Sequence, residues 1–388
     1  MIPGAWLLDP TVTHLNHGSF SAVPIPVLAA QDEWRRRWEA DTTEFVVSEW
    51  EPALDLSRKT LAKFVGAEHV NMVFVSNATA GVNVVARSFP FAAGDEILTT
   101  THAYNACRNV LDHVAEGSGA KVVAVSVPFP ILDSDVVIEL IKEAVTPRTR
   151  FALIDHVTSA TGLVLPIEDI VPLLEEAGVA VCIDGAHGPG MVPLALEDLG
   201  ASYYTGNNHK WLSAPKGSAF LWARSDRQSD LVPMTISHGY NDPRIDRPRF
   251  HLLFDYPGAI DVTPHLVLPE AIAYLEGLHE GGLPGLMARN RDLAITQRQR
   301  LVDFLDIEAP APESMIGALA AVPISPAQPG APVGVTDQLG RTLRETYRIQ
   351  VPIFPWPAPP QRLLRISAAP YNDEADYDRL LAALANEL

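Results

Sequence analysis

The fold and its site are decided by two stretches of sequence, Val179-Ala-Val-Cys-Ile-Asp184-Gly-Ala-His187 and Tyr203-Tyr-Thr-Gly-Asn207-Asn-His209-Lys210. The first is an apolar, β-branched run that ends in an acid, which is typical of a buried strand whose carboxylate meets a ligand. A lysine flanked by polar residues, such as Lys210, could form a Schiff base if burial or a neighbouring group lowers its pKa from about 10.4. The same stretches also allow Asp184 to cap a turn and Lys210 to be a solvated surface charge.

Around these stretches, short apolar runs alternate with helical patterns from residue 53 to residue 221. Such alternation predicts an α/β fold with a mainly parallel sheet covered by helices. Strands are predicted over residues 72–75, 96–99, 122–127, 151–154 and 179–183, and helices over 27–40, 53–65, 103–115 and 168–177. Ligands bind at the carboxyl ends of such strands, so the chemistry is expected just after each run.

A second region is predicted to begin near Pro264. Helical patterns over residues 268–278 and 286–304 open it, and a helix after Asn372 closes it. The proline-rich stretches 309–332 and 351–360 predict loops around short strands. A smaller C-terminal unit with helices and a few strands is therefore expected.

Composition limits the class of protein. The 388 residues, 47% of them hydrophobic, suggest two domains or one large domain with an appendage. A formal net charge of −18 disfavours general binding to nucleic acid or to an anionic membrane. Cys107 and Cys182 are too few for a disulfide framework and too isolated for structural zinc, so no metal site is expected. The sequence shows no membrane-spanning run and no signal-peptide pattern, which predicts a cytoplasmic protein.

A polar segment also follows the first predicted strand, with the sequence Phe74-Val-Ser76-Asn77-Ala78-Thr79-Ala-Gly81. Its hydroxyl and amide side chains could simply cap the next helix, or the helix N-terminus could bind a phosphate. A phosphate site, a buried acid and an imine-forming lysine together are what pyridoxal phosphate requires. This combination favours a pyridoxal-phosphate enzyme.

With these segments in order, the chain resembles the class V aminotransferase-fold enzymes, and in particular their isopenicillin N epimerase-like branch, which is related to cysteine desulfurases and cysteine C–S lyases. The resemblance rests on six motifs: Asn16-His-Gly-Ser-Phe20, Ser76-Asn-Ala-Thr79, Thr101-His-Ala-Tyr104-Asn-Ala, Asp184-Gly-Ala-His187, Asn207-Asn-His-Lys210 and Arg365-Ile-Ser. It implies the cofactor pyridoxal 5'-phosphate, the aspartate aminotransferase-like fold type I and a homodimer. It further implies a large domain over residues 16–263 and a small α+β domain over 264–388 together with 1–15.

The resemblance also implies roles for single residues. Lys210 would form the imine with the cofactor and move the proton at the substrate α-carbon, while Asp184 would pair with the pyridine nitrogen. The phosphate would be held by Ala78, Thr79, Asn207 and His209.

Further residues would surround the ring and the substrate. Tyr104 would lie against the ring face, with His102 or Ala103 as alternative alignments. The residues near the ring hydroxyl or the phosphate would be Ser159 and His187. The substrate would be met by Arg365, which could bind its carboxylate through two parallel hydrogen bonds, and by Asn16 and His17. Without the resemblance, Arg365 could equally form an interdomain ion pair, and Asn16 and His17 a turn.

Two departures from the family pattern bear on the reaction. Many relatives carry a Gly-Thr pair whose threonine reaches the phosphate bound by the neighbouring subunit, and this chain has Gly258 and Ala259 there. Cysteine desulfurases need a nucleophilic cysteine in the C-terminal half, and no cysteine follows Cys182. Transfer of sulfur to a protein persulfide is therefore not expected.

The expected activity is chemistry at the α-carbon of a small-molecule amino acid through an external aldimine. Processing of a bulky cysteine S-conjugate by a C–S lyase, in small-molecule or antibiotic biosynthesis, is the favoured prediction. The alternatives are an isopenicillin N epimerase-like epimerase, an aminotransferase, a decarboxylating or oxidatively deaminating variant, and a non-catalytic ligand sensor. A nucleotide-binding enzyme is disfavoured because neither a Gly-x-Gly-x-x-Gly motif after an early strand nor a Walker lysine motif occurs.

Overall fold

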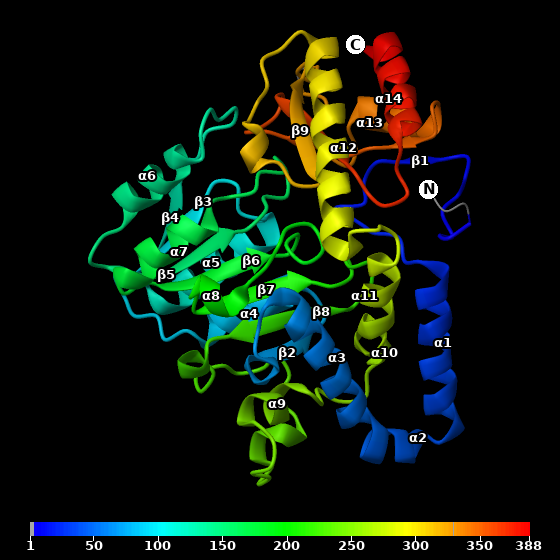
Figure 1. The fold of residues 1–388 in the computed structure, drawn as a ribbon. Coiled ribbons are helices and arrows are strands. Elements are labelled where there is room, and N and C mark those ends of the chain that lie inside the picture. Colours follow the sequence, from blue (N-terminus) through cyan, green and yellow to red (C-terminus); the bar gives the residue numbers. More distant parts are fainter. Residues whose placement is uncertain (1–3, 329) are drawn as a thin grey trace.

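The computed structural model describes residues 4–328 and 330–388. Residues 1–3 of the predicted segment 1–15, and Pro329 in the predicted loop 309–332, lie outside the described residues. The structure is α/β throughout the described chain, with helices on both faces of one large central sheet (Figure 1).

The central sheet has seven strands in the order β2-β8-β7-β6-β5-β3-β4. Within this sheet β8 is antiparallel to both of its neighbours, and the other six strands are parallel to one another. The strands are β2 (Met72–Val75), β3 (Glu96–Thr100), β4 (Lys121–Val125), β5 (Thr149–Asp155), β6 (Ala180–Gly185), β7 (Tyr203–Asn207) and β8 (Ala219–Ala223). The five strands predicted from apolar runs and the mainly parallel sheet are confirmed.

Helices cover the two faces of this sheet in separate layers, because alternate residues of each buried strand point to opposite sides. In β5, Phe151 and Leu153 pack towards α4, α5 and α9, while Ala152 and Ile154 pack towards α3, α6 and α7. The helices of these two layers are α3 (Trp50–Val65), α4 (Ala78–Ser88), α5 (Asn105–Ser118), α6 (Asp135–Ala144), α7 (Ile167–Glu176) and α9 (Arg249–Phe254). A short helix, α8 (Leu196–Leu199), precedes β7.

A second, smaller sheet lies in the C-terminal part of the chain. Its three antiparallel strands have the order β11-β12-β9, and its neighbours α12 and α14 pack beside it (Figure 1). Its strands are β9 (Leu319–Ile324), β11 (Ile353–Pro355) and β12 (Arg362–Ser367). The helices of this part are α10 (Thr263–Leu266), α11 (Leu268–Glu276), α12 (Gly282–Leu305), α13 (Gln338–Glu345) and α14 (Glu374–Glu387).

The N-terminal segment joins this second sheet region. β1 (Thr13–His14) pairs in parallel with β10 (Ile349–Gln350), so the blue N-terminal segment lies beside the orange C-terminal region in Figure 1. After β1 the chain enters α1 (Ile25–Ala40) and the single turn α2 (Thr42–Glu44), which leads through a π-helical turn into α3. The N-terminal segment thus contacts the C-terminal region, while the division into domains at residue 264 stays a prediction.

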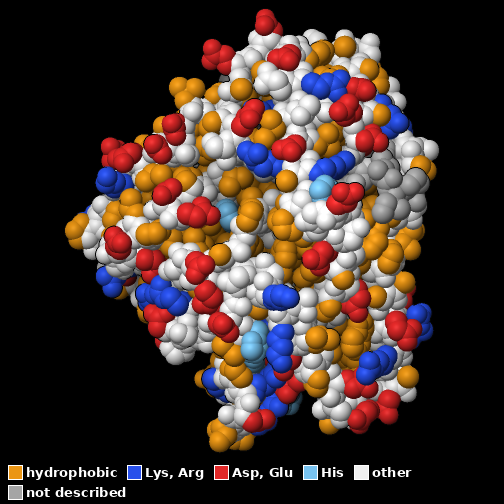
Figure 2. Space-filling view, viewed as in Figure 1, with side chains coloured by type: hydrophobic (Ala, Val, Ile, Leu, Met, Phe, Trp, Pro, Cys, Tyr) orange, Lys and Arg blue, Asp and Glu red, His pale blue; other side chains and the backbone are white. Residues whose placement is uncertain are grey.

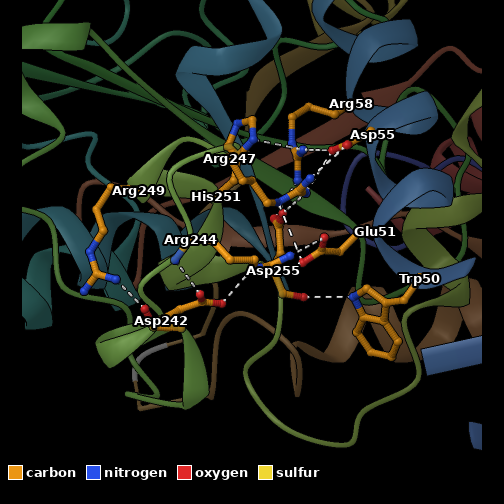
Figure 3. Close-up of polar contacts among 11 residues, drawn as sticks. Trp50, Glu51, Asp55, Arg58, Asp242, Arg244, Arg247, Arg249, His251 and Asp255 are labelled. Carbon is orange, nitrogen blue, oxygen red and sulfur yellow. Dashed lines mark hydrogen bonds and ion pairs between the residues drawn. The ribbon is translucent and has the colours of Figure 1, made fainter. Parts of the chain in front are cut away.

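An ion-pair cluster ties α3 to the segment that leads into α9 (Figure 3). In this paired-arginine cluster, defined as Asp55, Arg58, Arg247, His251 and Asp255, both arginines contact both acids. The Nη2 of Arg58 lies 2.5 Å from Asp255 Oδ1, and the Nη1 of Arg247 lies 2.9 Å from Asp55 Oδ2.

The acids and the histidine of this cluster are close enough to one another to resemble metal ligands. Both carboxylates are nevertheless bonded to guanidinium groups, so the cluster is built from ion pairs. The expectation of no metal site stays a prediction.

The molecular surface mixes side chains of both charges. Figure 2 shows acidic and basic side chains interspersed with apolar ones over the viewed face, and basic and histidine side chains gathered over α9. Among the helices of the described residues, none has the length and apolar character needed to span a membrane.

Candidate active site

The carboxyl ends of the parallel strands open into one large cavity of about 1050 Å³. Its walls come from the ends of β5, β6 and β7, the start of α4, the N-terminal segment around Asn16 and the segment from Ile349 to Pro355. Nine of the residues predicted from the sequence line it: Asn16, Thr79, Tyr104, Ser159, Asp184, His187, Asn207, His209 and Lys210. The rule that ligands bind at strand ends therefore located this cavity.

Lys210 lies in the wall of this cavity as a buried amine. Its Nζ is 3.0 Å from Nε2 of His187, and no carboxylate of the described residues lies within ion-pair distance of it. The pKa of Lys210 is lowered to about 8, chiefly by burial; Asp184 opposes this shift and Arg365 adds to it. A lysine with such a pKa is partly uncharged near neutral pH, which a nucleophile or base requires.

Two carboxylates stand side by side at the strand ends. Asp155 and Asp184 are register partners on the parallel strands β5 and β6, and both line the cavity. The thiol of Cys107 donates to Asp184 Oδ2 at 3.2 Å, and the backbone N–H of Ala186 donates to Oδ1 at 3.0 Å. Burial and the neighbouring Asp184 raise the pKa of Asp155 well above its ordinary value. Asp184 is thus a buried acid with no cationic partner among the described side chains, and it faces the cavity.

The start of α4 forms another part of the wall. Asn77 is its N-cap and accepts from the backbone N–H of Ala80 at 2.8 Å. Gly81 lets the helix approach β7 closely, because a Cβ there would lie 2.1 Å from Thr205 Oγ1. This approach places the helix N-terminus beside Asn207, where partial positive charge favours an anion such as phosphate.

Ala78 is placed differently from the sequence prediction. Its backbone N–H donates to Asn207 Oδ1 at 2.8 Å, and its neighbours Asn77 and Thr79 line the cavity instead. Ala78 is the first residue of α4, and its amide points to Asn207 at the end of β7. A direct contact of this amide with a phosphate would require Asn207 to move.

His17 also lies away from the cavity wall. It is buried, its Nε2 donates to the carbonyl of Lys210 at 3.1 Å, and its Nδ1 accepts from the hydroxyl of Tyr371 at 3.0 Å. Both ring nitrogens are therefore occupied by the protein. The position of His17 behind Lys210 does not agree with the predicted contact with substrate.

Arg365 on β12 is fully buried directly behind the wall. Its guanidinium donates to the carbonyl of Ser159, to Asn16 Oδ1 at 3.2 Å and to Ser19 Oγ at 2.8 Å, and it lies over the ring of Phe354. All four of these neighbours line the cavity, whereas Arg365 itself does not. Burial lowers the pKa of Arg365 to about 9, and among the described residues no carboxylate pairs with it. The interdomain ion pair that the sequence left open as an alternative for Arg365 does not occur among the described residues.

The structure places the three candidates for the ring-stacking residue, Tyr104, His102 and Ala103, in different surroundings. Tyr104 is 47% exposed and lines the cavity. His102 is buried on the other side of the turn, where it bonds Thr161 Oγ1 at 2.8 Å and packs against Trp356. Ala103 lines a separate cavity with Trp356. The geometry favours Tyr104, and its stacking on a ring stays a prediction.

Sequence reasoning missed several residues of this site. Asp155 follows the predicted strand 151–154, so the rule of strand ends could have found it. Ser19 lies inside the quoted motif that begins at Asn16, and Trp211 directly follows Lys210. Contacts of Ser19 with Arg365 and of Trp211 with His187 depend on segments distant in sequence, and no local signal announces them.

Comparison with known proteins identifies the family. The family description "Aminotransferase class-V" matches residues 16–380. The chain belongs to the class V aminotransferase family. Isopenicillin N epimerase of Amycolatopsis lactamdurans is 35% identical to this chain, and the match covers 99% of both chains. A probable chloroplastic L-cysteine desulfhydrase of Arabidopsis thaliana is 31% identical over 97% of this chain and 83% of its own length.

Solved structures agree on the fold. A cystine C–S lyase in complex with its product cysteine persulfide superimposes with a TM-score of 0.81 at 19% identity, covering 97% of this chain and 98% of its own. A second structure of that lyase carries glycine covalently linked to its pyridoxal-phosphate cofactor. The fold of this class V member is pyridoxal-phosphate fold type I, as the sequence resemblance implied.

The cavity fits the cofactor that the family uses. A buried acid and a buried amine, neither with an ion-pair partner among the described residues, and a helix N-terminus all face the same space. These are the groups that a pyridinium nitrogen, an aldehyde and a phosphate need. The protein is a pyridoxal 5'-phosphate enzyme of the class V aminotransferase family, and its relatives include proteins named isopenicillin N epimerase and L-cysteine desulfhydrase.

Proposed function

We propose that this enzyme is a C–S lyase that cleaves the side chain of a cysteine S-conjugate. The single observation that carries the proposal is that one cavity brings together the amine of Lys210, the carboxylate of Asp184 and the start of α4. These three groups suit chemistry at an amino-acid α-carbon. The choice of a sulfur-containing substrate rests on the cysteines, on the cavity and on the named relatives.

The residues that would hold the cofactor follow from this cavity. Asp184 would face the ring nitrogen, and Tyr104 would lie over the ring. The phosphate would be bound by Thr79, His209, Asn207 and the N-terminus of α4, with Ser159 and His187 near the ring hydroxyl. When bound, pyridoxal phosphate supplies an electron sink for the carbanion formed at the α-carbon.

Lys210 would hold the cofactor and then move the α-proton. Its pKa of about 8 allows the released amine to accept a proton near neutral pH. The contact with His187 orients Nζ within the wall at 3.0 Å. In this proposal Lys210 takes the α-proton as the bond between the β-carbon and sulfur breaks, and the electron pair of that bond leaves with sulfur.

The substrate carboxylate would be attracted by Arg365. A buried guanidinium without an acid partner is costly unless an anion approaches it. Because Asn16 and Ser19 stand between Arg365 and the cavity, binding requires the carboxylate to take the place of one of these contacts. A guanidinium can then bind the carboxylate through two parallel hydrogen bonds.

Sulfur would leave as a thiol rather than pass to the protein. Both cysteines of the sequence, Cys107 and Cys182, are buried, and burial raises the pKa of each thiol. The overall reaction is then a cysteine S-conjugate and water giving the thiol, pyruvate and ammonium. The cavity is large and mostly apolar towards Val335 and Phe354, which leaves room for a bulky S-substituent.

Epimerisation is the second candidate, because the relative at 35% identity carries the name isopenicillin N epimerase. Inversion needs a second acid on the opposite face of the α-carbon. The phenol of Tyr104 lines the cavity and could supply it.

The two activities differ in their products. The holoenzyme is incubated with S-substituted L-cysteines in D₂O, and pyruvate, thiol and the stereochemistry of remaining substrate are measured. The lyase proposal predicts pyruvate and thiol in equal amounts. Substrate returned only as its stereoisomer with deuterium at the α-carbon, without pyruvate, would contradict it and support the epimerase. Tyr104→Phe should abolish epimerisation but leave lyase turnover within about tenfold.

A further inference from the structure

Trp211 lies behind the cavity wall and contacts the histidine that meets Lys210. Its side chain is 3% exposed and does not line the cavity. Its indole Nε1–H donates to Nδ1 of His187 at 3.2 Å. The ring centroid of His17 lies 4.9 Å from that of the indole, so the indole contacts two histidines.

The backbone also holds this arrangement in place. Gly190 follows the turn that carries His187 and has a φ of +83°. A Cβ at Gly190 would lie 2.7 Å from the carbonyl carbon of Trp211. A glycine here therefore allows the turn of His187 to approach the backbone after Lys210.

This contact decides which nitrogen of His187 carries a proton. An indole nitrogen only donates, so Nδ1 of His187 must accept with its lone pair. Burial lowers the pKa of His187 well below its ordinary value, so the ring is neutral at neutral pH. A neutral imidazole that accepts at Nδ1 has its proton on Nε2.

The Nε2–H group then points at Lys210 Nζ, which is 3.0 Å away. An uncharged amine has a lone pair that accepts this hydrogen, whereas an ammonium group has none. The contact therefore favours the uncharged form of Lys210. Among the described side chains, His187 is the one that forms a hydrogen bond with Nζ.

We propose that Trp211 is a positioning residue that fixes the proton of His187 on Nε2 and thereby favours the uncharged form of Lys210. The inference rests on the proposed role of Lys210 as the cofactor-binding lysine. It assigns a part in the chemistry to a residue that touches neither cofactor nor substrate.

The charged and titratable groups around Lys210 act in both directions. Asp184 on β6, Asp155 on β5 and Cys107 on α5 favour the ammonium form, and Arg365 on β12 disfavours it. His17 is neutral because burial lowers its pKa to about 3, and it bonds the carbonyl of Lys210 rather than Nζ. None of these groups shares the hydrogen bond that Trp211 directs through His187.

The test removes the indole N–H. In Trp211→Phe, Nδ1 of His187 is free to carry the proton, so Nε2 can present a lone pair to the ammonium form of Lys210. Hydrogen bonding to the charged form favours that form, so the pKa of Lys210 should rise by about one unit. The uncharged fraction at neutral pH then falls about tenfold.

Two measurements report this change. The cofactor-free full chain is mixed with pyridoxal 5'-phosphate, and the rate at which the imine band forms is followed against pH. The wild-type profile should have its midpoint near the pKa of about 8, and the variant profile should lie about one unit higher. Separately, ¹⁵N NMR of labelled histidines should show wild-type His187 protonated on Nε2 and the variant protonated on Nδ1, with the signal assigned by its loss in His187→Gln.

A matched control is Trp222→Phe. Trp222 is equally buried, and its indole N–H donates to Glu197 Oε1 at 3.1 Å on another part of the sheet. The pH profile of imine formation and the His187 NMR signals of Trp222→Phe should equal those of the wild type. If Trp211→Phe does not fold, 3-benzothienylalanine at position 211 keeps the shape of tryptophan and removes only the N–H.

The outcomes separate the two claims. An unshifted profile in a folded variant without the indole N–H, an unchanged proton on Nε2, or an equal shift in Trp222→Phe would each overturn the inference. A wild-type chain that forms no imine band would instead overturn the role of Lys210. The NMR measurement would in that case still decide whether Trp211 fixes the proton of His187.

Discussion

Arg58 and Arg365 are both fully buried, yet their surroundings are opposite. Arg58 belongs to the paired-arginine cluster, where Asp55 and Asp255 balance its charge (Figure 3). Among the described residues, Arg365 bonds only neutral oxygens, those of Ser159, Asn16 and Ser19.

This difference separates buried cationic side chains with a structural role from those with a functional role in this fold. A buried cation that the protein itself neutralises joins two elements, here α3 and Asp255 at the end of α9. A buried cation that the protein leaves without an anion, next to a cavity, lowers stability unless an anionic ligand supplies the missing charge. Lys210 belongs to the second kind, because its amine also lacks an acid partner among the described residues.

The largest effect is expected from breaking the neutralised cluster. Asp255→Asn keeps the shape of the side chain but leaves Arg58 and Arg247 with Asp55 as their shared acid. Loss of one partner of a buried ion pair costs about 3–5 kcal/mol of unfolding free energy. Urea unfolding of the variant and wild type at neutral pH measures this loss. A loss below about 1 kcal/mol would show that the cluster does not hold α3 in place.

Arg365→Gln should have the reverse pattern. The fold loses an unbalanced buried charge, so its unfolding free energy should equal or exceed that of the wild type. Substrate capture should weaken by about 3 to 4 kcal/mol, which is about a hundredfold to a thousandfold in kcat/KM. Steady-state kinetics and urea unfolding on the same preparation measure both values. Arg365→Lys keeps the charge without the planar fork, so its kcat/KM should lie between those of the wild type and Arg365→Gln. A destabilised Arg365→Gln with normal kinetics would assign Arg365 a structural role instead.

Lys210 should destabilise the cofactor-free chain in a pH-dependent way. The pKa of its amine is about 8 in the folded chain and 10.5 ordinarily, so the unfolded chain binds the extra proton between these values. The penalty is complete below pH 8 and disappears as pH rises towards 10.5. Lys210→Met should therefore be more stable than the wild type by about 1–3 kcal/mol at neutral pH and equal to it in strong alkali. Denaturant unfolding across this range checks it, and a constant difference would contradict the assigned pKa.

The smallest effect is expected at an exposed ion pair outside the paired-arginine cluster. Arg244 pairs with Asp242 at 3.0 Å, but the arginine side chain is 42% exposed. Exposed ion pairs contribute about 0–1 kcal/mol, so Asp242→Asn should change the urea midpoint little. It is the matched control for Asp255→Asn, and a loss as large as that of Asp255→Asn would remove the distinction between the buried and exposed pairs.

The sequence predicted those parts of the site that lie at strand ends. Asp184 could be found because an apolar run followed by polar residues marks the carboxyl end of a buried strand. Lys210 could be found as a lysine between polar residues, and the role of Asn207 comes from the resemblance to the family. The strands and the parallel sheet follow from the same alternation.

Other parts depend on contacts between distant segments. His17 turns its ring to Tyr371 and to the backbone of Lys210, and Arg365 is closed off by Asn16 and Ser19. Such contacts join the N-terminal segment to β12 and to the loop after β7, and no local pattern in any of the three segments reveals them. The homodimer, and the effect of Ala259 on a neighbouring subunit's phosphate, stay predictions.

The central claim is that Lys210 carries the cofactor in a site built around uncompensated cations. The direct test is borohydride reduction of the holoenzyme, followed by digestion and mass spectrometry of the modified peptide. We expect the reduced cofactor on Lys210 of the wild type and no label in Lys210→Ala. Lys216 also lines the cavity, and Lys216→Arg should give the same result as the wild type. A cofactor found on Lys216, or on any other lysine of the wild type, would contradict the account.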